Sequence, residues 1–277
     1  MIRTIASIAL AFSLLVARPA AGAFERPPVD AASAGVGGVL ATSSDPVFGN
    51  PALASRVAAG VSASAARPFG LAELREGQVA AWMTLGSVHA HPIALAAGAR
   101  TFGSSAWAER ELRLGLAAEV GPGIAIGLAA RGLSAGGPGL AAVRSVAVDL
   151  SLRVSASGAE IGAVAEAVAG EIPGDPTGER RRSSLGVRSP LARGDVFLEL
   201  QRTEDRAPSL VLGVTQRLAP GLEARAGIRE DTGEIAFGLG LTLLRSRVDL
   251  AVIPGDLGRT VRVSAGIFGD SRAASPP

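Results

Sequence analysis

Apolar and polar side chains alternate with a period of two along most of this chain, and this alternation constrains the fold more than any other feature. The stretch from Val143 to Ser155 shows it most clearly. Its even positions from Val146 to Val154 are all Val or Leu, whereas its odd positions are mostly polar. A period of two is typical of a β-strand with one apolar face and one polar face. We therefore expect an all-β protein.

The pattern recurs in about fourteen segments of about ten residues, separated by turns rich in Gly, Pro and Asp. Two stretches, Phe69–Gln78 and Glu171–Ser189, are ambiguous, so the predicted strand number holds to within two. Several turns are so short that neighbouring strands must be antiparallel, which favours a meander. We expect strands at Val57–Ala66, Gln78–Ser87, Ile93–Phe102, Arg110–Val120, Ile124–Leu133, Val143–Ser155, Ala159–Ala169, Ser183–Ser189, Asp195–Arg202, Ser209–Leu218, Leu222–Arg229, Glu234–Leu244, Arg247–Val252 and Arg259–Phe268.

A soluble sandwich or a soluble periplasmic binding barrel would also alternate, so the chemistry of the two faces has to separate these folds from a membrane barrel. One face is almost purely Leu, Ile, Val and Ala, as contact with lipid requires, while the other carries Glu, Arg, Asp and Ser. Burying those charges in a dry core without partners would be costly, and a wet lumen removes the cost. We therefore predict a transmembrane antiparallel up-and-down β-barrel of about fourteen strands with a short N-terminal plug segment.

The first residues have the features of a secretory signal peptide. Arg3 supplies the positive start, Ile5–Val16 the apolar stretch, and Ala21-Gly22-Ala23 a small-x-small cleavage site. We expect a signal peptide at residues 1–23, a lead-in and plug segment at 24–56, a barrel at 57–269 and a C-terminal tail at 270–277. With no Cys, disulfides and a lipoprotein anchor are excluded. The expected location is the outer membrane of a Gram-negative envelope.

The charged residues are dispersed, and every basic residue is Arg. The formal net charge is +2 and only 4% of residues are aromatic, so the chain lacks the basic patch and stacking aromatics of a nucleic-acid binder. An outer-membrane barrel usually carries aromatic girdles at both interfaces. The aromatic residues expected near strand ends form only a thin belt: Phe69, Trp82, Phe102, Trp107, Phe197, Phe237 and Phe268.

Motifs that carry enzyme chemistry do not add up to an active site. Ser134 lies in a Gly-x-Ser-x-Gly sequence, but no His follows it and a Gly-rich loop takes the place of the required helix. His89 and His91 form a pair without a converging carboxylate or thiolate. Gly121-Pro122-Gly123 is a turn between two strands and not a phosphate loop. The cluster Arg180–Arg182 is expected in a solvated loop, with contact to a lipopolysaccharide phosphate as the alternative. We therefore expect no enzyme activity, cofactor or metal.

The polar faces of the strands carry charges of both signs that are expected to face the lumen. Mixed signs favour a cross-strand network of ion pairs that stiffens the barrel, and the alternative is a polar path for a solute. The residues are Glu111, Arg113, Glu119, Arg131, Asp149, Arg153, Glu160, Glu166, Glu199, Arg225, Arg229, Asp249 and Arg262.

The segment from Gly35 to Ala54 is rich in small residues and follows no period. Gly37 and Gly38 permit close backbone approach, and Asn50 before Pro51 and Ala52 is expected in a turn, held extended. Asp45 is expected to meet a lumenal arginine such as Arg113 or Arg153. These features predict an inward plug at residues 34–54, either fixed or acting as a moving gate.

This opening resembles the Asn-Pro-Ala sequence that begins outer-membrane barrels of the PorV/PorQ and FadL-like superfamily. The C-terminal stretches Phe237–Leu241, Val248–Val252 and Leu257–Phe268 are similar to the closing strands of that family. Leu250 stands where the family usually has Tyr, and a tail follows Phe268. The long extracellular loops and long hatch of the fatty-acid transporters are missing, which favours the compact PorV-like branch.

The resemblance implies a non-enzymatic barrel that acts in envelope export as a scaffold or as a narrow transporter. Its implied partners are outer-membrane lipid, the barrel-assembly machinery and secretion or envelope proteins. Facilitated uptake of a small hydrophobic solute and a soluble periplasmic binding barrel remain the alternatives.

Overall fold

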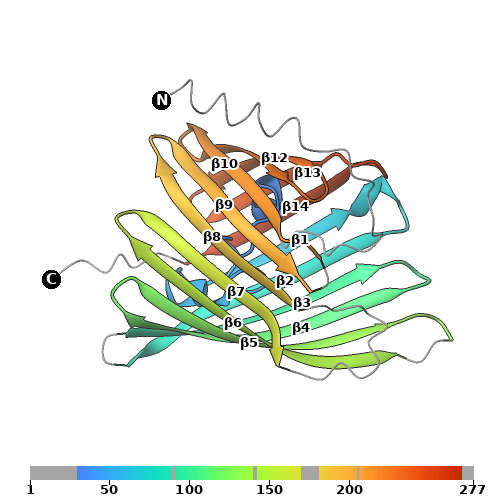
Figure 1. The fold of residues 1–277 in the computed structure, drawn as a ribbon, viewed down its shortest axis with the longest axis horizontal. Coiled ribbons are helices and arrows are strands. Elements are labelled where there is room, and N and C mark those ends of the chain that lie inside the picture. The colour runs from blue at the N-terminus through green and yellow to red at the C-terminus, as the bar shows by residue number, and fades with distance from the viewer. Residues whose placement is uncertain (1–29, 89–90, 140–141, 170–180, 205, 270–277) are drawn as a thin grey trace.

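The fold is a closed barrel of fourteen antiparallel strands, seen in a computed structural model that describes residues 30–88, 91–139, 142–169, 181–204 and 206–269 (Figure 1). The strands are β1 (Gly60–Arg67), β2 (Arg75–Val88), β3 (His91–Gly103), β4 (Ala108–Gly121), β5 (Ile124–Gly136), β6 (Val143–Ala156), β7 (Ala159–Ala169), β8 (Arg182–Leu191), β9 (Gly194–Thr203), β10 (Ser209–Ala219), β11 (Leu222–Arg229), β12 (Ile235–Leu243), β13 (Ser246–Ile253) and β14 (Thr260–Phe268). Three short helices accompany them: α2 (Ala31–Gly35), η1 (Pro51–Ser55) and η2 (Pro68–Gly70).

Each strand pairs with its sequence neighbours, and β1 pairs with β14 to close the ring, from Gly60 opposite Phe268 to Arg67 opposite Val261. This is the up-and-down topology that the short turns predicted. All fourteen predicted strands are confirmed. No helix among the described residues is long and apolar enough to cross a membrane.

The two ends of the barrel differ in the length of their connections. At the end where β1 begins, consecutive strands are separated by two residues each, at positions 89–90, 122–123, 157–158, 192–193, 220–221 and 244–245. The other end has longer connections, at residues 68–74, 104–107, 137–142, 170–181, 204–208, 230–234 and 254–259. We call these the short-turn end and the long-loop end.

The outer surface of the strands is apolar. On β4, Leu112, Leu114 and Leu116 are 66%, 56% and 50% exposed, whereas the intervening Glu111 and Arg113 are buried. Water would oppose such a continuous exposed apolar surface, and lipid would not. Apolar side chains on the outside and charged side chains on the inside are typical of transmembrane barrels.

One irregularity interrupts the wall between β6 and β7. Val148 pairs with Ala169 and Leu150 with Ala165, so three residues of β7 lie opposite one residue of β6. The bulged Ala167 has a positive φ of 55°, and its N–H donates to Asp149 Oδ1 at 2.9 Å. At the bulge, a backbone N–H of the wall therefore bonds to an inward side chain and not to the neighbouring strand.

Strand boundaries and aromatic positions differ from the predictions in places. The second strand begins at Arg75 and not at Gln78, because the ambiguous stretch after Phe69 divides into η2, a loop and the start of β2. Trp82 and Phe197 are only 5% and 7% exposed, so they face inward and do not belong to a girdle, whereas Phe237 is 53% exposed. The predicted signal peptide, the C-terminal tail and residues 171–180 lie outside the described residues.

Candidate functional site in the barrel lumen

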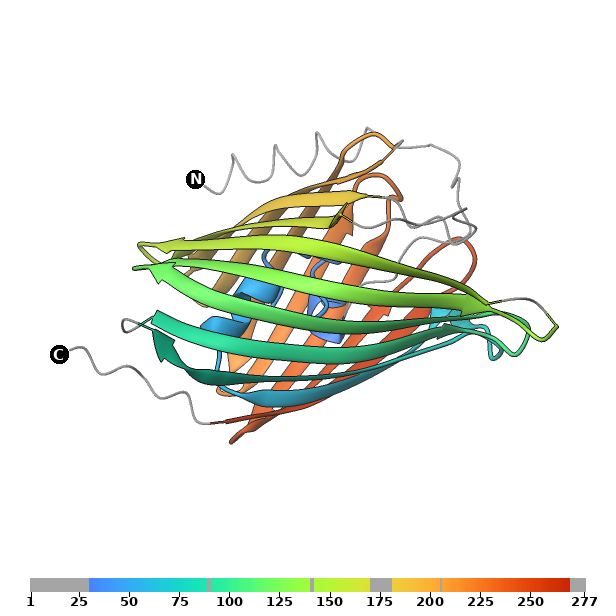
Figure 2. The ribbon, with the colours of Figure 1, turned by 90° about the horizontal axis from the view of Figure 1, so that it is seen from below.

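The N-terminal residues 30–56, here called the inner segment, lie within the ring of strands (Figure 2). The segment begins with α2, whose N-cap Asp30 accepts a hydrogen bond from the N–H of Ser33 at 2.6 Å. Ala31 and Ala34 pack against Ala236, Ala251 and Ile253 of β12 and β13. The segment ends with η1, which lies against β2 to β6. It therefore crosses from one wall of the barrel to the other.

A carboxylate of the barrel wall holds the middle of the inner segment. Glu199 on β9 is fully buried, and its two oxygens accept hydrogen bonds from the N–H groups of Leu40, Ala41 and Thr42 at 2.8, 3.0 and 3.3 Å. Gln201, two residues further on, donates from Nε2 to the carbonyl of Gly38 at 3.0 Å and to Glu199 at 2.7 Å. Three peptide donors aimed at one carboxylate form an anion-binding turn, so Glu199 fixes the local backbone of the segment.

Asp45 organises the next turn of the inner segment from within. Its Oδ1 accepts from the N–H groups of Val47 and Phe48 at 2.8 and 2.9 Å. Burial, together with the nearby Asp30, raises the pKa of Asp45 from 3.8 to about 6, against the opposing effect of those peptide donors and Arg113. The segment thus contains an acid that can change charge near neutral pH.

The predicted ion pair of Asp45 with Arg113 or Arg153 does not occur among the described residues. Arg113 instead donates from Nη1 to the carbonyls of Val47 and Phe48 at 3.0 and 3.2 Å and lies over the Phe48 ring at 5.6 Å. Arg153 donates to the carbonyl of Ser43. The Asp45 carboxylate already accepts hydrogen bonds from two peptide N–H groups. The two arginines therefore donate to backbone carbonyls of the inner segment and not to Asp45.

The Asn50-Pro51-Ala52 motif forms the N-terminus of η1. The Asn50 side chain accepts from the N–H of Ala52 at 3.0 Å and donates to the carbonyl of Ala41 at 2.7 Å. Ser151 on β6 also accepts from the N–H of Ala52 at 2.9 Å. The asparagine therefore caps the helix and ties two parts of the inner segment together, a role that only an amide with both donor and acceptor can fill.

Glycines of the wall make room for the backbone of the inner segment. A Cβ at Gly162 on β7 would overlap the carbonyl oxygen of Ala41, and one at Gly227 on β11 would overlap the backbone of Val36. Within the segment, Gly37 and Gly38 have φ values of 88° and 83°, which favour glycine. The segment is thus fitted to the wall by missing side chains as well as by hydrogen bonds.

The inward charges form ion-pair networks. One lies toward the long-loop end, where Glu76 pairs with Arg100 and Arg262 at 2.8 and 2.5 Å, and Arg113 pairs with Asp149 and Glu166 at 3.2 and 3.3 Å. The remaining pairs of this network join Arg100 and Arg113 to Glu111, and Arg131 to Asp149.

A second set of ion pairs lies toward the short-turn end. Arg225 pairs with Asp249 at 2.6 Å and with Glu223 at 2.7 Å. The other pairs are Arg247 with Glu223 and Asp249, Arg153 with Glu160, Arg188 with Glu160 and Asp195, and Arg56 of the inner segment with Glu119. At the long-loop end of β11, Arg229 donates to Gln201 and to the carbonyl of Gly38.

The structure places all of the predicted lumenal charges on the inner face of the wall. Their pairing was not predictable, and several inward residues were absent from the predicted set, among them Glu76, Arg100 and Gln201. Arg100 and Gln201 stand in phase with the inward positions of their strands, so the alternation itself carried that signal. Glu76 was missed because the predicted second strand began two residues after it.

The motifs weighed for enzyme chemistry remain scattered. Ser134 lies on β5 and His91 begins β3, while His89 lies outside the described residues. No group of three or more His, Cys, Asp or Glu that could hold a metal occurs among the residues that the structure describes.

Comparison with known proteins shows similarity of fold without similarity of sequence. No family model and no curated protein matches the chain. Among solved structures, the CymD monoaromatic hydrocarbon channel matches with a TM-score of 0.63 at 13% identity, covering 89% of this chain and 99% of that one. A deltaS2 mutant of the TodX monoaromatic hydrocarbon channel matches with a TM-score of 0.62 at 12% identity, covering 89% and 100%.

The toluene transporter TodX of Pseudomonas putida itself matches with a TM-score of 0.58 at 10% identity, covering 88% of this chain and 97% of that one. At these identities the likeness shows the fold alone. The chain shares the barrel fold of these channels, and the predicted transmembrane up-and-down barrel of about fourteen strands is confirmed as its fold.

Proposed function

We propose that the protein is an outer-membrane channel for small hydrophobic solutes and that the inner segment is its gate. The observation that carries this proposal is that residues 30–56 cross the lumen. The contacts that hold this segment can be broken without unfolding the barrel. Glu199, Gln201 and Arg113 hold this segment from the wall through hydrogen bonds to its backbone. None of these bonds belongs to the strand ladder.

The outward apolar belt supports a place in the membrane, since Leu112 and its neighbours on β4 are exposed side by side. Short turns at one end and longer connections at the other are the usual asymmetry of bacterial outer-membrane barrels, with the short turns toward the periplasm. The expected signal peptide would bring the chain there. Outer-membrane lipid and the barrel-assembly machinery are then its expected partners.

A hydrophobic solute suits this barrel better than a hydrophilic one. Paired charges line the lumen and the inner segment crosses it, which disfavours a wide water-filled path. The bulge at Ala167 interrupts the strand pairing beside this region, and we propose this point as the exit of an apolar solute toward the bilayer. The proteins with the same fold named above are described as hydrocarbon channels.

A reversible lock of the inner segment tests the proposal. A Cβ at Gly186 on β8 would lie 3.0 Å from the Thr42 Cγ2, which is within reach of a disulfide between Thr42→Cys and Gly186→Cys. The chain has no other cysteine. The assay is uptake of radiolabelled toluene by Gram-negative cells that express the full chain, compared with cells that carry an empty vector.

We expect uptake by the wild type and by the reduced double variant, and its loss after oxidation. Uptake that persists in the oxidised form would overturn the gate but keep the channel. Absence of toluene uptake by the wild type, with the protein folded in the outer membrane, would overturn the channel itself.

A scaffold or partner role in envelope export, as in the PorV-like branch, is the second candidate. The observation that favours it is the dense set of contacts between the inner segment and the wall, which suits a closed barrel. Cross-linking in intact cells would separate the candidates. A scaffold should capture a secretion or envelope protein and show no toluene uptake. Neither candidate requires an enzyme activity or a cofactor.

A further inference from the structure

Three arginines lie together on the outer face of the barrel at the long-loop end. Arg67 ends β1, Arg75 begins β2, and Arg259 directly precedes β14. All three are exposed and in phase with the outward residues of their strands, such as Ala65 on β1. Arg67 lies opposite Val261 of β14, and the pairing of Ala66 with Glu76 brings Arg75 beside Arg67. Arg67 and Arg75 therefore lie side by side on adjacent strands, and Arg259 lies two residues beyond the position opposite Arg67, toward the connection.

No carboxylate of the described residues forms an ion pair with this cluster. None of the three guanidinium groups has an ion pair or a side-chain hydrogen bond there, and the neighbouring Glu76 points inward to Arg100 and Arg262. Like charges on directly adjacent strand positions destabilise a sheet. An anion between the arginines would reverse this repulsion, and guanidinium groups bind phosphate through paired hydrogen bonds.

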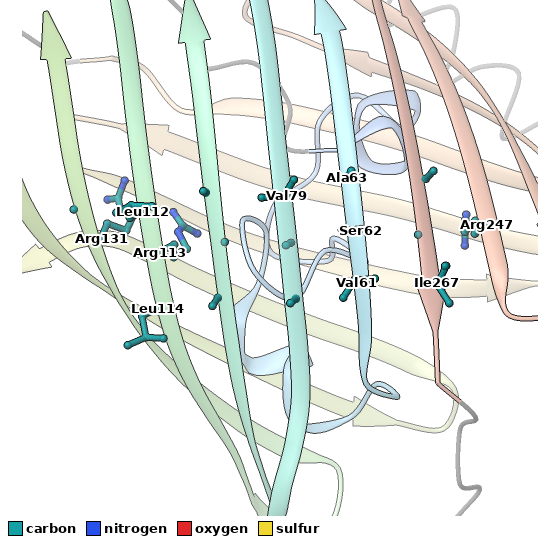
Figure 3. Close-up of a pocket in the computed structure, with 18 of the residues that line it drawn as sticks. Val61, Ser62, Ala63, Val79, Leu112, Arg113, Leu114, Arg131, Arg247 and Ile267 are labelled. Carbon is teal, nitrogen blue, oxygen red and sulfur yellow. The ribbon is translucent and has the colours of Figure 1, made fainter.

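The arginines surround a hollow of about 800 Å³ that Ala65, Val261 and Val263 also line. A second hollow, of about 1050 Å³, lies further along the outer face of these strands (Figure 3). Its outward lining includes Val61, Ala63, Val79, Ala265 and Ile267. Ala65 and Ala63 are successive outward positions of β1, and Val263 and Ala265 are successive outward positions of β14. The basic hollow thus continues into an apolar one.

We propose that this surface binds a phosphorylated glycolipid of the lipid A type from the outer leaflet. The phosphate lies among Arg67, Arg75 and Arg259, and the acyl chains lie over the small residues of β1 and β14 below it. The long-loop end faces the outer leaflet in the orientation proposed above, which matches the side where such lipids reside. At the short-turn end of the same strands the outward residues are apolar, including Val61, Leu85 and Ile267.

The test compares two variants with the same change in charge at the same end of the barrel. Arg67→Gln/Arg75→Gln/Arg259→Gln removes the cluster. Arg110→Gln/Arg144→Gln/Arg202→Gln, the scattered variant, removes three exposed outward arginines from the non-adjacent strands β4, β6 and β9. Folding of each variant is checked by the heat-dependent shift in gel mobility. If the cluster variant does not fold, Arg75→Gln alone replaces it.

Binding of lipid A to the full folded chain in detergent is measured by native mass spectrometry, with dephosphorylated lipid A and inorganic phosphate as further probes. We expect lipid A binding to weaken about tenfold or more in the cluster variant and to stay within about twofold in the scattered variant. Binding of dephosphorylated lipid A should be weak to all forms. Strong binding of inorganic phosphate at the cluster would overturn a lipid site in favour of a free anion site.

Equal lipid A binding by both variants would overturn the inference. The inference depends on the proposed outer-membrane location but not on transport. A wild type that binds lipid A without toluene uptake would thus reject the channel and keep this site.

Discussion

At the scale of single residues, the lumen depends on polar groups that satisfy peptide donors and acceptors of the inner segment. Glu199 serves three peptide N–H groups, and Arg113 serves two carbonyls. A peptide group buried without a partner costs free energy, so each of these side chains determines the backbone path nearby. Changing one of them should loosen the inner segment and leave the strand ladder intact.

Replacing Glu199 with Ala should weaken the contact of the inner segment with the wall by about 2–4 kcal/mol, since three buried peptide N–H groups lose their acceptor. The measurement is hydrogen exchange at the amides of Leu40, Ala41 and Thr42, which should become faster while the amides of β9 stay protected. Glu73→Ala, at an exposed position in the connection after η2, is the control. Unchanged exchange at the three amides would contradict the anchoring role.

Because of Asp45, the stability of the contact between the inner segment and the wall should depend on pH. Its pKa is raised from 3.8 to about 6, so between these values the folded protein keeps a proton that the unfolded chain releases. The contribution of Asp45 is therefore most favourable below about pH 3.8, weakens as the pH rises and is least favourable above about pH 6.

The test compares wild type with Asp45→Asn, which is neutral at every pH and retains an acceptor for Val47 and Phe48. At pH 7.5 the variant should protect the amides of the inner segment better, by about 1–3 kcal/mol, and the difference should vanish near pH 4. Taking the difference at each pH cancels the intrinsic pH dependence of exchange. A difference that is independent of pH would exclude titration of Asp45 as its cause.

At the scale of elements, the inner segment fits the wall because certain strand positions lack a side chain. Gly162 on β7 contacts the Ala41 carbonyl, whereas no heavy atom lies within 4 Å of a Cβ built at Gly132 on β5. Both glycines lie in strands, so the same substitution tests close approach at one position and general strand effects at the other.

Gly162→Ala should push the inner segment away from β7 and raise its hydrogen exchange at least about tenfold, an effect of about 1.4 kcal/mol or more. If the segment is the gate, single-channel conductance in planar bilayers should also rise. Gly132→Ala should behave like the wild type in both measurements. Equal effects of the two substitutions would mean that loss of glycine in the strand, and not displacement of the segment, is responsible.

At the scale of the whole molecule, the barrel places its charges inside and its apolar residues outside. Leu114 on β4 is exposed in the middle of the apolar belt, whereas Leu257 is exposed in the connection between β13 and β14. Only the first of these two positions would lie within the bilayer. The pair therefore tests the membrane orientation of the fold.

Leu114→Arg should lower the free energy of unfolding in lipid vesicles by about 2–4 kcal/mol, as expected for an arginine near the bilayer midplane. Leu257→Arg should change it by less than about 1 kcal/mol. The measurement is reversible urea unfolding followed by Trp fluorescence. A soluble barrel would tolerate both substitutions equally, and that result would exclude the membrane belt.

The strands and their two faces were determined by the sequence alone. A period of two is a local property, and stretches such as Leu222–Arg229 were predicted with the bounds that the structure has. The length of a turn is also a local property, so the short turns predicted that neighbouring strands are antiparallel. The inward position of Arg113, Arg131 and Asp249 likewise needed no knowledge of distant residues.

Only the tertiary structure decided which groups meet. Glu199 reaches Leu40 across 159 positions of the chain, and Arg262 reaches Glu76 across 186. Such contacts depend on barrel closure and strand register, which no local pattern encodes. The same holds for the path of the inner segment, for the bulge at Ala167, and for the meeting of Arg67, Arg75 and Arg259. The sequence specified the faces of the barrel because those follow from local alternation, and the contacts in its lumen and at its rim follow from closure of the ring.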